Sequence, residues 1–194
     1  MKAARTIVIG VICISLVVGY YYYISNKDTA AESTDLTEVQ KVILKDISGS
    51  SYPATPREVV KLYNRILCCY YNEEYTEEEF EKLANQAIAL MDQELADNNP
   101  AEQYYLQVKA EVETYRARKR TINNASVCDT NEVEETVIDG RECAYVTSSY
   151  FVRDTEGFSK SSQRYVLRKD EDGNWKILAF ELQEGVTVED DESE

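Results

Sequence analysis

Residues 139–182 read DGRECAYVTSSYFVRDTEGFSKSSQRYVLRKDEDGNWKILAFEL, and this stretch decides the fold. Runs rich in β-branched and aromatic residues alternate in it with three dipeptides that are typical of tight turns: Asp139-Gly140, Glu156-Gly157 and Asp172-Gly173. Strands joined by links this short lie antiparallel to each other. The strands predicted around these turns cover residues 142–153, 159–168 and 175–182.

Upstream of residue 121 the apolar residues recur with the period of helices. The expected helix starts are two capping boxes, Thr55-Pro56-Arg57-Glu58 and Thr76 with Glu79, and the dipeptide Asn99-Pro100. The second helix is expected to run on through Met91 to Leu95. Its inward residues would be Phe80, Leu83, Ala87, Ile88, Met91 and Leu95.

Two further strands are predicted between the helices and the opening stretch, over residues 122–128 and 132–138. A chain with its helices first and its strands last is typical of the α+β class. We therefore expect three helices packed on one curved antiparallel sheet.

The N-terminal region contains an uncharged apolar run of 18 residues, Ile7 to Ile24. As a helix it would span roughly 27 Å, close to the hydrocarbon thickness of a bilayer. Lys2 and Arg5 precede it, and no acidic residue appears before Asp28. The positive-inside bias therefore predicts a single-pass anchor with a cytoplasmic N-terminus and an extracytoplasmic C-terminal domain at the cell membrane.

Two other interpretations of this run stay open. It is a cleaved signal peptide if Thr29-Ala30-Ala31 serves as the cleavage site, although 18 apolar residues exceed the usual length. It is otherwise a buried helix of a soluble domain. With the anchor interpretation the predicted parts of the chain are an anchor over 1–24, a stalk over 25–54, a domain over 55–183 and an acidic disordered tail over 184–194.

The stalk contains a short amphipathic piece, residues 36–47, with Val39, Ile43 and Ile47 on one helical face. Gly49 and the serines after it break this pattern. The piece is either a short helix that caps the domain or part of a mobile linker.

The charge of the chain excludes some partners. Lys2 and Arg5 are the only charged residues before residue 25, so the remainder has 19 Lys and Arg against 36 Asp and Glu, a net charge of −17. So acidic a surface repels nucleic acid and anionic lipid headgroups. The chain has no histidine, which removes Ser-His-Asp and Cys-His catalysis and the commonest metal ligand.

The cysteines show no CxxC spacing of a zinc site. An extracytoplasmic domain permits disulfides, and Cys128 with Cys143 is the plausible pair if their strands are adjacent. Buried free thiols are the alternative. Cys68 and Cys69 point to different faces of a predicted helix and are not expected to bridge each other.

The helix start at Thr55-Pro56 and the closing hairpin Asp172-Gly173-Asn174-Trp175-Lys176-Ile177 resemble the nuclear transport factor 2-like superfamily. This superfamily includes SnoaL-like and ketosteroid-isomerase-like proteins, and the resemblance covers residues 55–182. It implies a cone-shaped domain whose mouth holds a ligand between sheet and helices. The whole chain also resembles uncharacterised membrane-anchored proteins of Gram-positive gut bacteria.

Enzymes of this superfamily place an Asp, Tyr or His inside the cone. No residue here matches such a motif, so we assign no catalytic, cofactor-binding or metal-binding residue and expect no cofactor. The residues that would supply polar groups to the pocket are Tyr145, Tyr150, Tyr165 and Glu181. A buried Tyr–Glu pair would act as acid and base if burial raised the pKa of the carboxyl group. Core or rim packing is the other interpretation of these tyrosines.

The sequence therefore favours a non-enzymatic, membrane-anchored domain that binds an envelope protein or a small ligand outside the membrane. The alternative is an isomerase- or dehydratase-like enzyme that uses carboxylate and tyrosine chemistry in the cone. A sensor domain whose ligand changes its contacts with another membrane protein is a third option.

Overall fold

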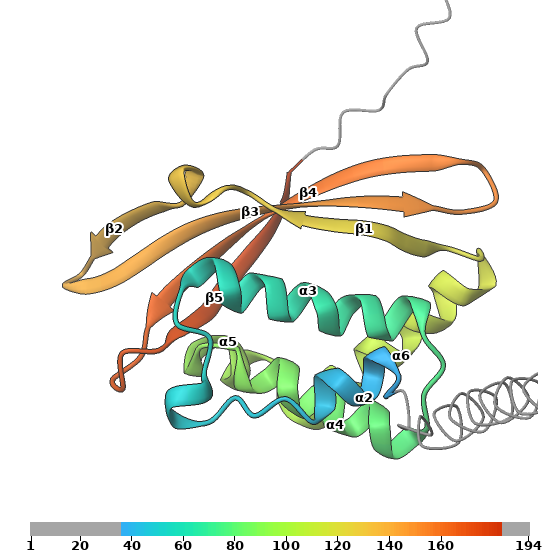
Figure 1. The fold of residues 1–194 in the computed structure, drawn as a ribbon, viewed down its shortest axis with the longest axis horizontal. Helices are drawn as coiled ribbons and strands as arrows, with labels where there is room; N and C mark the ends of the chain where they lie inside the picture. The colour runs from blue at the N-terminus through green and yellow to red at the C-terminus, as the bar shows by residue number, and fades with distance from the viewer. Residues whose placement is uncertain (1–35, 184–194) are drawn as a thin grey trace, which may run out of the picture. The chain divides into compact units, whose positions relative to one another are not determined.

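The computed structural model describes residues 36–183, and its compact unit begins at Glu38 (Figure 1). The helices are α2 (Glu38–Ile43), α3 (Pro56–Asn72), α4 (Glu77–Ala89), α5 (Gln93–Asn98) and α6 (Ala101–Ala117). The strands are β1 (Thr121–Val127), β2 (Glu134–Ile138), β3 (Arg141–Arg153), β4 (Phe158–Lys169) and β5 (Trp175–Gln183). Because all these helices precede all these strands, the predicted α+β order is confirmed.

The five described strands form one antiparallel sheet with β3 at its centre. The strand order is β1-β3-β4-β5, and β2 also pairs with β3. Strand β1 pairs with the C-terminal part of β3, and β2 pairs with the N-terminal part of β3. Along β3 the even-numbered residues from Ala144 to Val152 are buried, so this face of the strand points toward the helices.

Helix α3 lies between the sheet and the remaining helices (Figure 1). One side of it contacts β1, β3 and β5, and the other side contacts α2, α4 and α6. A helix in this position is covered on two sides, which explains why nine of its residues are buried. The layers are therefore sheet, α3, and then the outer helices.

Two helix starts follow from local side-chain chemistry, as the sequence predicts. At the start of α3, the Thr55 hydroxyl accepts a hydrogen bond from the Glu58 backbone N–H, and the Glu58 carboxylate accepts one from the Thr55 N–H. Thr76 and Glu79 form the same reciprocal pair at the start of α4. Each box satisfies N–H groups that the first turn of a helix cannot pair internally.

The expectation of one long second helix through Leu95 is wrong. Helix α4 ends at Ala89, and a separate helix α5 begins after Asp92, whose carboxylate accepts a hydrogen bond from the Glu94 N–H. Between the two helices the chain pairs with β5: the Asp92 N–H donates to the Ile177 carbonyl, and the Ile177 N–H donates to the Leu90 carbonyl, both at 2.8 Å. The cap and this parallel bridge outweigh the helical periodicity.

Within the piece over residues 36–47, Glu38–Ile43 form α2, which packs on α3 and α4. Its inward face centres on Val39 and Val42, which are fully buried, while Ile43 and Ile47 lie at the edge of the core. The buried face of α2 is therefore formed by Val39 and Val42, which are about one helical turn apart, and not by Val39, Ile43 and Ile47 as expected. Tyr52 is also buried and donates a hydrogen bond to the Trp175 carbonyl. Part of the predicted stalk therefore contributes to the core.

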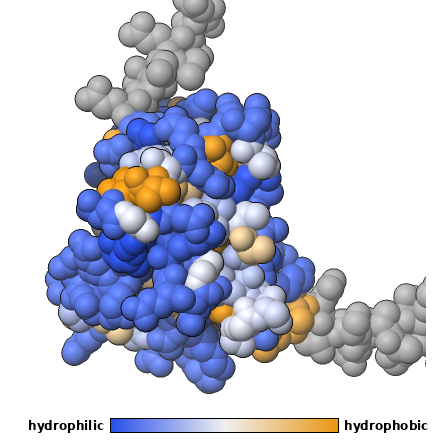
Figure 2. All heavy atoms as spheres, turned by 90° about the vertical axis from the view of Figure 1, so that its left-hand side faces the viewer, coloured by the Kyte–Doolittle hydropathy of each residue, from blue (hydrophilic) through white to orange (hydrophobic). Residues whose placement is uncertain are grey.

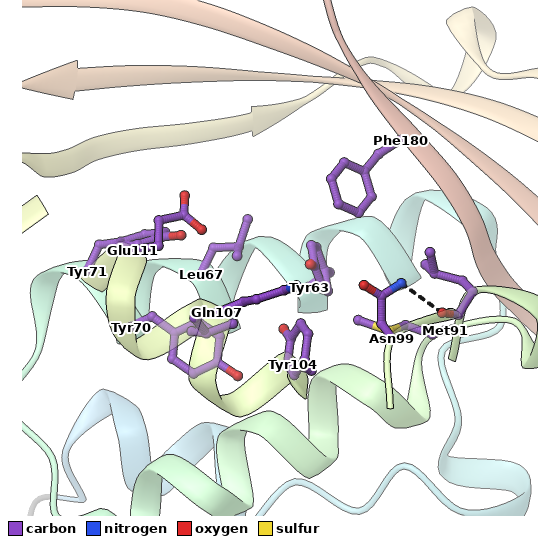
Figure 3. A pocket seen from close by; sticks show the side chains of 12 residues that line it. Tyr63, Leu67, Tyr70, Tyr71, Met91, Asn99, Tyr104, Gln107, Glu111 and Phe180 are labelled. Carbon is purple, nitrogen blue, oxygen red and sulfur yellow. Dashed lines mark hydrogen bonds between the residues drawn. The ribbon is translucent and has the colours of Figure 1, made fainter. Parts of the chain in front are cut away.

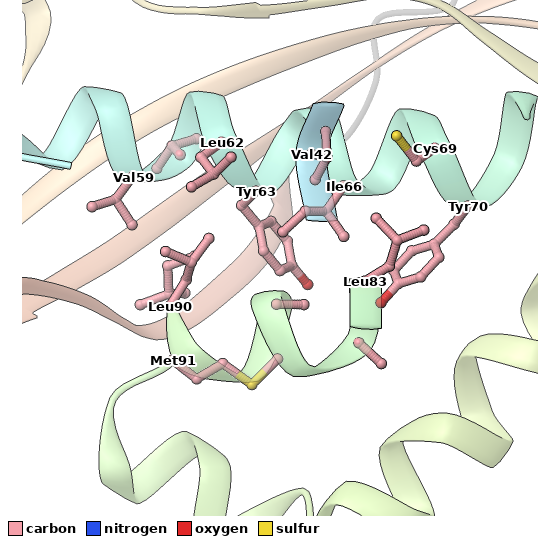
Figure 4. Close-up of a cluster of buried hydrophobic side chains, with 14 of the residues drawn as sticks. Val42, Val59, Leu62, Tyr63, Ile66, Cys69, Tyr70, Leu83, Leu90 and Met91 are labelled. Atoms are coloured by element: carbon pink, nitrogen blue, oxygen red, sulfur yellow. The ribbon is translucent and has the colours of Figure 1, made fainter. Parts of the chain in front are cut away.

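The main core joins α2, α3 and α4 to the sheet. Figure 4 shows its centre, where Leu62 and Ile66 of α3 pack with Leu83 and Leu90. Trp175 and Ile177, at the start of β5, are 5% and 1% exposed and belong to the same core. A smaller cluster of Ile122, Tyr150 and Val152 packs under the C-terminal part of β3.

The four cysteines of the described part are free thiols: Cys68, Cys69, Cys128 and Cys143. The Cys128 N–H bonds to the Thr147 carbonyl, so Cys128 lies opposite Thr147 and not opposite Cys143. Four residues of strand, about 13 Å, separate these positions, which is too far for a disulfide. The pairing of Cys128 with Cys143 considered from the sequence is therefore absent.

The predicted anchor over 1–24, the stalk up to residue 35 and the tail over 184–194 lie outside the described residues. Within residues 36–183, no helix combines the length and apolarity needed to cross a bilayer. One face of the described domain is mostly hydrophilic, with only small separate hydrophobic patches (Figure 2).

Candidate functional site

Two adjoining cavities lie between α3, α6 and the sheet. The first measures about 170 Å³ and the second about 310 Å³. They share part of their walls, and the shared residues are Tyr63, Leu67, Tyr71, Glu111 and Phe180. Figure 3 shows the first cavity, with side chains of α3 and α6 facing it and Phe180 reaching toward it from β5.

Helical spacing places these side chains on one side of each helix. On α3, Tyr63, Leu67 and Tyr71 follow one another at intervals of four residues. On α6, Tyr104 and Val108 line the first cavity, and Glu111 follows on the same side of the helix. Residues three or four apart share one helical face, so each helix contributes a continuous strip of wall.

Tyrosines dominate the lining. Tyr70 and Tyr104 join Tyr63 and Tyr71 around the first cavity, and Tyr115 and Tyr150 join them around the second. Burial raises the pKa of all six phenols. They are therefore neutral at physiological pH and offer hydroxyl groups for hydrogen bonding, but no phenolate.

The second cavity is backed by a buried hydrogen-bond network. The Tyr150 hydroxyl lies 2.6 Å from both the Asn64 Oδ1 and the Tyr165 hydroxyl, and Tyr165 Oη lies 2.7 Å from Gln163 Oε1. Asn64 also donates to Ser148 Oγ at 2.7 Å. The two phenols have one proton each for three short contacts, so the network has no spare donor. It ties α3 to β3 and β4.

Tyr70 contributes a different feature. Its side chain is fully buried and lines the first cavity, and its hydroxyl interacts with that of Tyr104, which lines the same cavity. The first cavity therefore contains a pair of interacting phenols as well as apolar walls.

Glu111 supplies the formal charge of the site. It is an exposed residue of α6, and its carboxylate lies beside Tyr71 (Figure 3). After burial, the negative charge of Glu111 is the next largest cause of the raised pKa of Tyr71 and of Tyr115. The carboxylate is therefore close enough to act electrostatically on both phenols.

The structure brings two of the four sequence-predicted pocket residues together. Tyr150 lines the second cavity, and Tyr165, which does not line it, hydrogen-bonds to the Tyr150 hydroxyl. Tyr145 lies on the other face of β3, where the Arg164 guanidinium is 4.3 Å from the centre of its ring. Glu181 is opposite Arg164 in the β4–β5 register and is exposed, while its neighbour Phe180 faces the cavities.

Sequence reasoning missed the contributions of α3 and α6. The helical period predicts Tyr63 and Tyr104 only as buried helix residues and Tyr71 only as the end of its helix, and it singles out no role for Glu111. Their helical spacing indicates a shared inward face, but it does not distinguish a packed face from a cavity wall. Within residues 36–183, no group of three or more acidic or cysteine side chains is arranged to hold a metal ion.

Fold and cavities together define an α+β domain whose helices and antiparallel sheet enclose a tyrosine-lined site. The chain belongs to the family described as domain of unknown function DUF6715, whose sequence profile matches residues 1–180. A comparison with curated proteins returns no match.

Proposed function

We propose that this chain is a membrane-anchored domain of the cone-shaped, nuclear transport factor 2-like kind that binds a small ligand between its helices and its sheet, without catalysis. One observation carries the proposal: two adjoining cavities of about 170 and 310 Å³ are walled by neutral phenols, apolar side chains and a few further polar groups, among them Glu111. Cavities of about 150 Å³ bind benzene, so a one-ring ligand fits. Concave, mostly apolar sites with few polar groups are typical of ligand pockets.

The enzyme alternative is less well supported. Acid–base chemistry in a cone needs a buried carboxyl group with a raised pKa or a phenol with a lowered one. The lining phenols have raised pKa values, and Glu111 is exposed. The arrangement therefore favours holding a ligand over moving its protons.

Binding of a neutral aromatic probe tests this function. We expect indole to bind the full-length protein in ligand-observed NMR. Leu67 borders both cavities, so Leu67→Trp should fill them and weaken binding at least about tenfold, a loss of about 1.4 kcal/mol. Leu106→Trp is the matched control, because Leu106 is 65% exposed on α6 and lines neither cavity.

Unfolding midpoints of both variants verify that the fold is retained, and Leu67→Phe replaces Leu67→Trp if that variant fails to fold. Indole binding that is equal in the wild type and in a folded Leu67 variant would contradict the proposal, as would no binding to the wild type.

The anchor is a separate part of the proposal and rests on the apolar run Ile7 to Ile24 after Lys2 and Arg5. Its test is the location of a C-terminal epitope in intact cells. We expect the epitope to be cleaved by added protease and the chain to stay with membranes after carbonate washing. A chain released by carbonate would overturn the anchor.

A further inference from the structure

Glu111 lies in the wall that the two cavities share, and it is the only formally charged residue among the side chains that line them within residues 36–183. No lysine or arginine belongs to either lining. The other polar side chains there are hydroxyls and amides. A ligand in this site therefore meets one negative charge in the lining, while the Arg120 guanidinium, paired with Asp154, lies 5.4 Å from the ring centre of Tyr115.

Three of the five basic residues between positions 102 and 120 form ion pairs with other carboxylates. Lys109 pairs with Glu77, Arg116 with Glu74 and Arg120 with Asp154. Among residues 36–183 no basic side chain forms an ion pair with Glu111. The carboxylate at the cavity wall is thus available to a cation from outside the chain.

The surroundings of Glu111 suit an ammonium group. Tyr71 of α3 and Tyr115, which follows Glu111 by one turn of α6, both line the second cavity, and their rings stack with centroids 4.2 Å apart. Their phenol oxygens are able to accept hydrogen bonds from a donor beside the carboxylate. An –NH₃⁺ group has three donors and no acceptor, so a carboxylate with neighbouring hydroxyls matches it. Leu67 and Phe180 leave apolar walls for the rest of a ligand.

We propose that the ligand of this site is a small amine, with a protonated ammonium group held at Glu111 and an apolar or aromatic body in the cavities. This inference rests on the proposed ligand-binding function and names the chemical class of the ligand. An anionic ligand is disfavoured twice, by Glu111 itself and by the net charge of −15 on the whole chain.

Three one-ring probes that share a body and differ in charge test the inference: 2-phenylethylammonium, 2-phenylethanol and phenylacetate. Their dissociation constants for the full-length protein in non-ionic detergent are measured by NMR titration. We expect the cation to bind about fivefold tighter than the alcohol, because an ion pair with an exposed carboxylate is worth up to about 1 kcal/mol. Phenylacetate should bind most weakly.

Glu111→Gln keeps the size of the side chain and removes its charge, so it should bring the cation and the alcohol to equal affinity. Glu113→Gln is the charge-matched control, because Glu113 is exposed on the same helix and lines neither cavity. It should keep the fivefold preference. Unfolding midpoints of both variants verify that they are folded.

The outcomes separate this inference from the proposed function. If the alcohol binds and the cation binds no tighter, or if Glu111→Gln keeps the preference, the cavity is a binding site and the amine inference is wrong. If neither the alcohol nor the cation binds, both are wrong. A preference that Glu111→Gln and Glu113→Gln abolish equally is an effect of overall charge and also overturns the inference.

Discussion

The guanidinium of Arg168 on β4 donates hydrogen bonds from two of its nitrogens to the carboxylate of Asp92, the residue that caps α5. The Asp92 side chain is only 3% exposed, and that of Arg168 is 17% exposed. A planar two-pronged contact of this kind fixes geometry as well as charge. It holds the short helix α5 to the sheet.

Replacing Asp92 by Asn should lower the free energy of unfolding at pH 7 by about 3 kcal/mol. Asn keeps the helix cap but leaves the Arg168 charge without its buried partner, and breaking a buried pair costs about 3–5 kcal/mol. Urea denaturation measures the difference. Asp97→Asn, an exposed change on the same helix, should stay within about 0.5 kcal/mol of the wild type.

The same pair predicts a pH dependence. Burial alone would raise the pKa of Asp92, but the hydrogen bonds from Arg168 and the Glu94 N–H outweigh it, so the pKa lies below its ordinary value of 3.8. A lowered carboxyl pKa stabilises the fold fully above the unfolded value, and the effect is lost as pH falls through the folded one. The stability gap between wild type and Asp92→Asn should be constant above about pH 5 and shrink below 3.8. A gap that widens with acid would contradict this.

Removing the Tyr150 hydroxyl should destabilise the domain by about 2 kcal/mol, because the buried Asn64 Oδ1 would lose its partner. Thermal or urea unfolding of Tyr150→Phe measures this effect. The matched control is Tyr145→Phe on the outward face of β3, which should change stability by less than about 0.5 kcal/mol. Equal effects of the two substitutions would mean that the network contributes no stability of its own.

Thr55→Ala should lower the free energy of unfolding by about 1 kcal/mol, because the first turn of α3 loses the hydroxyl that accepts a hydrogen bond from the Glu58 N–H. Thr55→Ser keeps that oxygen and should recover most of the loss. The midpoint of urea unfolding compares the three proteins. Serine and alanine with the same midpoint would show that the methyl group of Thr55, and not the hydrogen bond, matters.

Cysteine alkylation should separate the four described thiols. Burial raises the pKa of Cys69 to about 12, and Cys69 and Cys143 are each 2% exposed. Iodoacetamide at pH 8 should therefore leave Cys69 unmodified in the folded protein, because the thiolate is the reactive form. After denaturation without reductant, mass spectrometry should find Cys128 and Cys143 both alkylated. A linked Cys128–Cys143 peptide would contradict the free thiols.

The parts of the fold set by local chemistry could be predicted from the sequence. The Thr55 and Thr76 caps act over three residues, and the Asp-Gly turns fix hairpins that are closed by neighbouring strands. The break between α4 and α5 was missed because its cause is distant. The Asp92 N–H pairs with Ile177, and its carboxylate meets Arg168, 76 residues away.

The candidate site was predictable only in part for a similar reason. Alternation along β3 separates Tyr145 from Tyr150, but both faces carry mixed residues, so the sequence does not say which one meets the helices. Packing against α3 decides it in favour of Tyr150. Glu111 looks like any exposed helical carboxylate, and only the cavity beside it gives it a candidate role.

The parallel bridge between the α4–α5 connection and β5 has a consequence for how the molecule opens. Across the boundary between the helical layer and the sheet, the Ile177 N–H donates to the Leu90 carbonyl, and the Asp92 N–H donates to the Ile177 carbonyl. The helical layer cannot separate from the sheet at this point without exposing these two amides to solvent. In native-state hydrogen exchange the amides of Asp92 and Ile177 should therefore exchange only with global unfolding, as members of a single cooperative unit.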